Sequence, residues 1–192
     1  MEARASAAFV GRVRELDELE RALRAAQAGD GATVLVAGEA GIGKSRLAAE
    51  VAHRARAAGF EVLLGRSLDL VGTELPYQPF ADALPSFAEL READSQLRVF
   101  EAALALLGDR GALAPALLVL EDLHWADAST LDLVVFLAHN LEDRPVLLLA
   151  TYRAGEPPSA ERVRRLADGV RRSGAGGARR AAHGARRRPA TD

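Results

Sequence analysis

Short apolar runs alternate with amphipathic segments along most of this chain. The apolar runs are of strand length, and they span residues 33–37, 60–64, 116–120 and 145–151. Before and between these runs, apolar residues recur at three- and four-residue steps, which predicts helices over residues 13–26, 44–58, 97–107 and 129–140. Strands that are apolar on both faces and alternate with helices are typical of a parallel sheet covered on both sides. The pattern therefore predicts an α/β fold of three layers, with a mostly parallel central sheet and helices on both faces.

Two stretches call for a separate interpretation. Residues 72–85 contain Pro76, Pro79 and Pro85. Because proline lacks an N–H group and fixes φ, we expect no regular interior element in that stretch. The segment from Ser129 to Asp132 has the form of a capping box, which predicts that Ser129 caps the helix that follows.

Charge is distributed unevenly along the chain. The net charge is −2, but residues 151–192 hold eleven arginines against four acidic residues, which leaves +7 there and −9 in the rest. The end of the chain is rich in Arg, Ala and Gly, and beyond about Val170 it lacks the apolar periodicity of a folded element. We therefore expect a helical N-terminal segment over residues 1–31, one folded core over residues 32–156, and a disordered tail over residues 157–192.

The composition also bears on the compartment. The chain has no cysteine, its start lacks the apolar core of a signal peptide, and its apolar runs are too short to span a bilayer. A chain without disulfides fits a reducing compartment. We expect a cytoplasmic protein with no membrane partner.

The candidate chemistry begins with a glycine-rich segment between the apolar run 33–37 and the helix that follows it. The segment has the complete G-x-x-x-x-G-K-[ST] pattern of the phosphate loop of P-loop NTPases. Its glycines let backbone N–H groups approach a polyphosphate, its lysine adds a positive charge, and its serine hydroxyl is a ligand for Mg²⁺. The expected nucleotide-binding residues here are Gly38, Glu39, Ala40, Gly41, Ile42, Gly43, Lys44, Ser45 and Arg46.

Two carboxylates follow the apolar run 116–120, where a phosphate loop needs an acidic partner for Mg²⁺. We assign Glu121 to Mg²⁺, together with Ser45, and Asp122 to activation of the attacking water; the reverse assignment of the two carboxylates remains open. Arg153 lies just past the apolar run 145–151, and there we expect a catalytic contact with the γ-phosphate. The alternative for Arg153 is an arginine on a solvated loop.

Four phrases in order resemble the nucleotide-binding part of AAA+-like and STAND signalling ATPases, as found in large LuxR-family regulators. They are residues 38–45, 75–80, 121–127 and 150–153, and residues 9–12 with 15–19 before them resemble the opening of AAA+-like and STAND ATPases. The resemblance implies that Val10, Gly11 and Arg12 lie near the adenine, and that the phosphate loop and the acidic pair hold ATP with Mg²⁺. It implies a regulatory module of transcription control, with slow or absent ATP hydrolysis, that binds ATP or ADP and associates with itself or with other signalling domains.

Two other readings stay open. One is a small-molecule P-loop kinase, although residues 66–110 show no lid with clustered arginines. The other is a non-functional remnant, because the family continues with a lid, a winged-helix subdomain and a DNA-binding helix-turn-helix that do not fit after residue 156. We therefore expect a truncated or frame-shifted product without a DNA-binding domain. The alternative is a functional basic tail that contacts nucleic acid.

Overall fold

One parallel sheet forms the centre of the protein. The computed structural model describes residues 12–69, 75–90, 95–153, 159–172 and 179–181. The strands are β1 (Ala32–Ala37), β2 (Glu61–Arg66), β3 (Ala116–Glu121), β4 (Val146–Tyr152) and β5 (Arg179–Ala181). They lie in the order β2-β3-β4-β1-β5, and every neighbouring pair is parallel.

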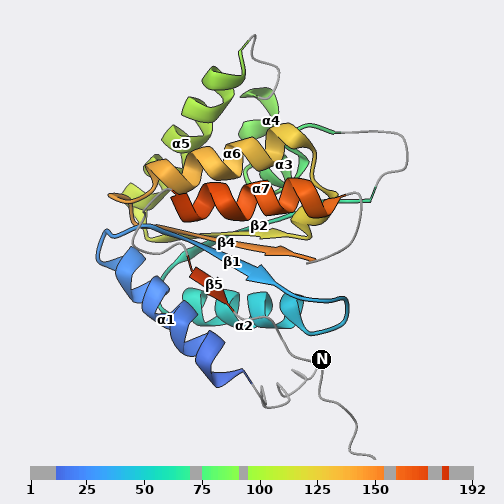
Figure 1. The fold of residues 1–192 in the computed structure, drawn as a ribbon. Coiled ribbons are helices and arrows are strands. Elements are labelled where there is room, and N and C mark those ends of the chain that lie inside the picture. Colours follow the sequence, from blue (N-terminus) through green and yellow to red (C-terminus); the bar gives the residue numbers. More distant parts are fainter. Residues whose placement is uncertain (1–11, 70–74, 91–94, 154–158, 173–178, 182–192) are drawn as a thin grey trace, which may run out of the picture.

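Helices cover both faces of this sheet, as Figure 1 shows. One face carries α1 (Val13–Gln27) and α2 (Lys44–Ala57). The other carries α3 (Gln78–Ala83), α4 (Phe87–Leu90), α5 (Gln96–Leu113), α6 (Ala128–Asn140) and α7 (Ser159–Arg172), and the 3-10 helix η1 (Leu123–Trp125) joins β3 to α6. The predicted three-layer α/β fold is thus confirmed.

Alternation along the central strands divides the core in two. On β3, Leu118 and Leu120 pack with the α3–α7 layer, while Leu117 and Val119 pack with α1 and α2. All four side chains are at most 2% exposed. A strand buried on both faces must be apolar at every position, which is why the continuous apolar runs predicted the strands correctly.

The proline-rich stretch contains a short helix that the sequence argument missed. Residues Gln78–Ala83 form α3, and Pro79 lies in its first turn. A proline is tolerated there because the first N–H groups of a helix have no intrahelical partner. The contact with β2 is very close: a Cβ built on Gly65 would lie 1.8 Å from the Pro79 carbonyl oxygen, so only glycine fits.

The cap of α6 is also different from the predicted one. Asp127, and not Ser129, is the N-cap, and its Oδ1 accepts from the Thr130 N–H at 2.9 Å. The other Asp127 oxygen accepts from the Thr130 hydroxyl and from the Tyr77 N–H, the latter at 3.3 Å. Tyr77 has the left-handed φ of 60°, which is strained for an aromatic residue. Asp127 therefore caps α6 and also holds the start of α3.

The basic end of the chain is more ordered than expected. A disordered tail was predicted from residue 157, but Ser159–Arg172 form α7 and Arg179–Ala181 pair with β1 as β5. Leu166 and Val170 of α7 are 2% and 1% exposed, in contact with the core of the α3–α7 layer. Their four-residue spacing was the available signal, and the surrounding arginines masked it. No helix in the described part of the chain is long and apolar enough to cross a membrane.

Asp127→Ala should lower the free energy of unfolding by about 2–4 kcal/mol, because it removes a helix cap and leaves the buried Thr130 N–H and hydroxyl short of an acceptor, while the Tyr77 N–H keeps the Thr130 hydroxyl as its acceptor at 3.0 Å. Ser129→Ala, at the position predicted from the sequence, should change it by less than about 0.5 kcal/mol. Urea unfolding followed by circular dichroism measures both. Equal effects of the two substitutions would contradict the assignment of the cap.

Candidate functional site

The parallel strands bring the candidate residues to one edge of the sheet. Gly38 follows β1, Asp122 follows β3 and Arg153 follows β4. Hydrogen bonds tie neighbouring strand ends together: the Gly38 N–H donates to the Tyr152 carbonyl at 3.3 Å, and the Ser67 N–H donates to the Glu121 carbonyl at 3.0 Å. Ligands bind at this edge in open α/β sheets.

The phosphate loop is an open turn between β1 and α2. Gly41 and Gly43 have φ values of 72° and 89°, a region that residues with a Cβ rarely adopt. Gly43 is the N-cap of α2 and has no side-chain cap. The N–H groups of the first helical turn therefore point at the loop without an intrahelical acceptor, which is the usual geometry of an anion site.

Lys44 lies inside this loop. Its Nζ donates to the Gly38 and Glu39 carbonyls, each at 2.9 Å, and the residue is only 7% exposed. Lys44 is the single lysine of the chain. Ser45 and Arg46 follow it in the first turn of α2 and are exposed.

The two predicted carboxylates lie in different surroundings. The Glu121 Oε1 is buried and has no hydrogen-bond partner. Asp122 has the left-handed φ of 58°, and its N–H donates to the Thr151 hydroxyl at 3.1 Å. Its Oδ2 accepts from Nε and Nη2 of Arg66, at 3.0 and 2.9 Å. The two side chains are therefore not equivalent: one carboxylate is unpartnered, and the other is paired with a cation.

A magnesium ion fits the unpartnered carboxylate. A buried oxygen with no partner is costly unless a cation or an ordered water satisfies it. Carboxylate oxygen is a ligand that Mg²⁺ prefers. The orphaned Glu121 oxygen, at the end of β3, has the chemistry of a metal ligand, and its assignment to Mg²⁺ stays a prediction.

Arg66 was not among the predicted site residues. It is the last residue of β2, two positions past the apolar run 60–64, and its side chain is 63% exposed. The available signal was positional: Arg66 ends β2 in the same register at which Glu121 ends β3. A charged residue at the end of the neighbouring strand belongs to the same edge.

The predicted adenine-binding segment is described in part. Val10 and Gly11 lie outside the described residues. Arg12 is half-buried, and its Nη2 donates to the Ile42 carbonyl in the phosphate loop. Arg153 is half-buried and follows β4 directly. The contact of Arg12 is therefore with the loop backbone, a partner that the sequence argument did not foresee.

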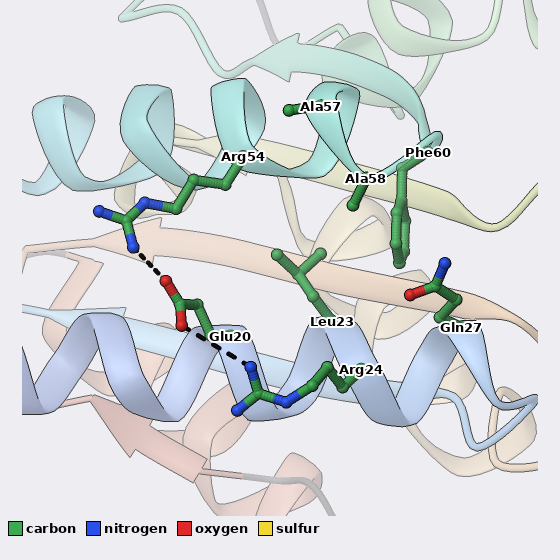
Figure 2. A pocket seen from close by; sticks show the side chains of 8 residues that line it. All are labelled: Glu20, Leu23, Arg24, Gln27, Arg54, Ala57, Ala58 and Phe60. Atoms are coloured by element: carbon green, nitrogen blue, oxygen red, sulfur yellow. Dashed lines mark hydrogen bonds and ion pairs between the residues drawn. The ribbon is translucent and has the colours of Figure 1, made fainter.

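A groove of about 480 Å³ lies elsewhere, between the C-terminal parts of α1 and α2 (Figure 2). Across it, Glu20 of α1 accepts from Arg54 of α2 and forms an ion pair with Arg24. Hydrogen bonds from Arg54 to Glu50 and to Glu20 raise the pKa of the Arg54 guanidinium. The groove is remote from the strand-end edge, and its charges are paired with each other, so it adds nothing to the candidate site.

Comparison with known proteins gives a family. A family model described as AAA ATPase domain matches residues 8–149. An uncharacterized protein of Rhizobium meliloti (strain 1021) is 26% identical, and the match covers 76% of this chain and 18% of that protein. The chain thus spans about a fifth of the length of this curated relative.

One solved structure shares the fold, and a second matches less closely. Cdc6p from Pyrobaculum aerophilum superimposes with a TM-score of 0.58 at 12% identity, over 84% of this chain and 45% of that chain. A structure of Drosophila ORC bound to DNA matches with a TM-score of 0.45 at 14% identity, over 81% of this chain and 89% of that chain. At these identities the likeness to Cdc6p shows the fold alone.

The Arg66–Asp122 ion pair should be weak. Because the Arg66 side chain is mostly exposed, a double-mutant cycle with Arg66→Ala and Asp122→Asn should give a coupling of less than about 1 kcal/mol in urea unfolding, and less at high salt. A weak pair can open, which leaves Asp122 available for chemistry. A salt-independent coupling above about 2 kcal/mol would instead mean that Asp122 is locked in a structural role.

Proposed function

The chain belongs to the AAA ATPase domain family, and we propose that it is the ATP-binding module of a regulatory ATPase. In this role the bound nucleotide sets the conformation, and hydrolysis is slow or absent. The observation that carries the proposal is the phosphate loop, in which glycines of positive φ keep the backbone open around the Lys44 ammonium. A loop of this form, followed by a helix N-terminus, is an anion-binding site of the kind that cradles polyphosphates.

Different residues of the site bind the phosphates, the Mg²⁺ ion and the attacking water. Lys44 exchanges its two carbonyl partners for phosphate oxygens, and the first turn of α2 adds N–H donors. Ser45 and Glu121 would hold Mg²⁺, which neutralises charge on the β- and γ-phosphates when bound. Asp122 orients the attacking water once Arg66 releases it, and Arg153 contacts the γ-phosphate.

The wider context of the module is also part of the proposal. The four phrases that resemble LuxR-family and STAND regulators support a role in signal transduction and transcription control. The curated relative is much longer than this chain, which fits a module that works beside other domains. We propose that the nucleotide state is passed on through self-association or through contacts with such signalling domains.

Lys44→Ala should weaken binding of a fluorescent ATP analogue by about tenfold or more, because charge-assisted hydrogen bonds contribute about 1.5–3 kcal/mol each. Arg56→Ala is the matched control, since it removes one exposed positive charge from the other end of the same helix. It should leave the affinity within twofold of wild type. Equal affinities for wild type and Lys44→Ala in a fluorescence titration would rule out the proposed site.

Glu121→Gln and Asp122→Asn should separate two roles. Loss of the metal ligand should reduce the Mg²⁺ dependence of ATP binding, while loss of the water-orienting carboxylate should leave binding intact and abolish the slow release of phosphate. Titrations with and without Mg²⁺, paired with a phosphate-release assay, measure the two effects. If each variant shows the effect expected of the other, the roles of the carboxylates are exchanged.

A further inference from the structure

Arg12 makes a contact that the nucleotide-binding role assigned to it does not explain. Its guanidinium donates to the carbonyl of Ile42, 30 residues further along the chain. Its own carbonyl accepts from the Leu16 N–H at 3.1 Å, in the first turn of α1, so its backbone is fixed as the start of that helix. The side chain therefore connects a fixed helix end to the middle of the phosphate loop.

The geometry of the peptide bond gives this contact a consequence inside the loop. In a trans peptide the carbonyl and the next N–H point in opposite directions. The carbonyl of Ile42 points at Arg12, so the N–H of Gly43 points away from Arg12 and α1. Gly43 has no Cβ and has a φ of 89°, so its own conformational preferences do not fix this peptide plane. The hydrogen bond from the Arg12 guanidinium to the Ile42 carbonyl therefore fixes the orientation of this peptide plane.

The helix that carries Arg12 is itself held firmly against α2. Leu16, Leu19 and Leu23 of α1 are at most 6% exposed and belong to the core shared with α2. Between Leu19 and Leu23 on the same helix, Glu20 accepts a hydrogen bond from Arg54 of α2 (Figure 2). Because α1 packs against α2, which follows the phosphate loop, the backbone of Arg12 at the start of α1 is held in place relative to the loop.

We propose that Arg12 is a positioning residue of the phosphate loop: by binding the Ile42 carbonyl, it turns the Gly43 N–H toward the place of the phosphates. The inference rests on the proposed nucleotide site and gives Arg12 a role different from a contact with adenine. A residue that acts through the loop affects every ligand with a diphosphate group, whatever its base. A residue that contacts the base affects nucleosides and leaves inorganic pyrophosphate unchanged.

The test compares ADP, inorganic pyrophosphate and adenosine on the full chain. Arg12→Ala should weaken binding of Mg-ADP and of Mg-pyrophosphate by the same factor, about tenfold, since a hydrogen bond to a charged donor is lost. Any binding of adenosine should be unchanged. Arg12→Lys keeps a cationic donor and should recover part of the affinity. Arg14→Ala removes an exposed charge two residues away and should behave as wild type.

A second readout follows the Gly43 amide itself. The chain has 17 glycines, so a spectrum of protein labelled with ¹⁵N-glycine is sparse enough to assign. At saturating pyrophosphate the Gly43 resonance should shift equally in wild type and in Arg14→Ala, and it should shift less in Arg12→Ala, where the Gly43 N–H is no longer turned toward the ligand. Circular dichroism and thermal unfolding of the same samples establish that the variants are folded; the Lys variant provides the measurement if the Ala variant is not.

The outcomes separate the two proposals. If wild type binds neither ADP nor pyrophosphate, the proposed function is wrong, and the role of Arg12 with it. If wild type binds both and Arg12→Ala binds both equally well, only the positioning role is wrong. If Arg12→Ala loses affinity for ADP but binds pyrophosphate as wild type does, the positioning role is also wrong, and Arg12 contacts the nucleoside instead.

Discussion

Every strand of the sheet pairs with its neighbours in parallel, and the candidate site depends on this pairing. The register between β2, β3, β4 and β1 brings Arg66, Glu121 and the residues after β4 to the edge where the phosphate loop begins. Segments more than a hundred residues apart are thereby joined by single hydrogen bonds, such as the one from Gly38 to Tyr152. The continuous apolar character of β3 and β4 is what makes the pairing stable, because both of their faces are covered. The candidate residues are thus held together at this edge of the sheet by the packing of helices on both faces of β3 and β4.

Charges at this edge are arranged so that backbone groups, as well as side chains, compensate the cations. Lys44 donates to two loop carbonyls and Arg12 to a third, while Arg66 is paired with Asp122. An arriving polyphosphate competes with neutral carbonyls for Lys44, and neutral acceptors are weaker partners for a cation than phosphate is. The carboxylates lie at the end of β3, which β4 separates from β1, and one of them has a buried oxygen without a partner. The arrangement favours an anion over the loop and a cation beside Glu121.

The sequence predicted what depends on periodicity and on local motifs. The four main strands, the phosphate loop and the acidic strand end follow from apolar runs and from residue types at fixed spacing. What it missed depends on contacts between distant segments. The short helix α3 requires a glycine at position 65, because a Cβ there would clash with the Pro79 carbonyl oxygen. Asp127, and not Ser129, caps α6, and the same side chain accepts from the distant Tyr77 N–H. The Arg66–Asp122 pair and the Arg12–Ile42 contact were missed for the same reason, because each joins residues that are distant in sequence. The helix α7 is the exception, because the spacing of Leu166 and Val170 was present and the basic composition outweighed it.

The single lysine has a consequence for covalent modification. All the other basic side chains of this chain, apart from its histidines, are arginines, so Lys44 is the only side chain that can be acylated on an ε-amine. It is almost fully buried and donates to carbonyls of its own loop, which protects the amine from acyl donors as long as the loop keeps this form. Acetylation of this protein on a side-chain amine, by an enzyme or by a reactive metabolite, therefore requires the loop to open. It would remove the one ammonium group from the loop, whereas the arginines on the surface do not react in this way.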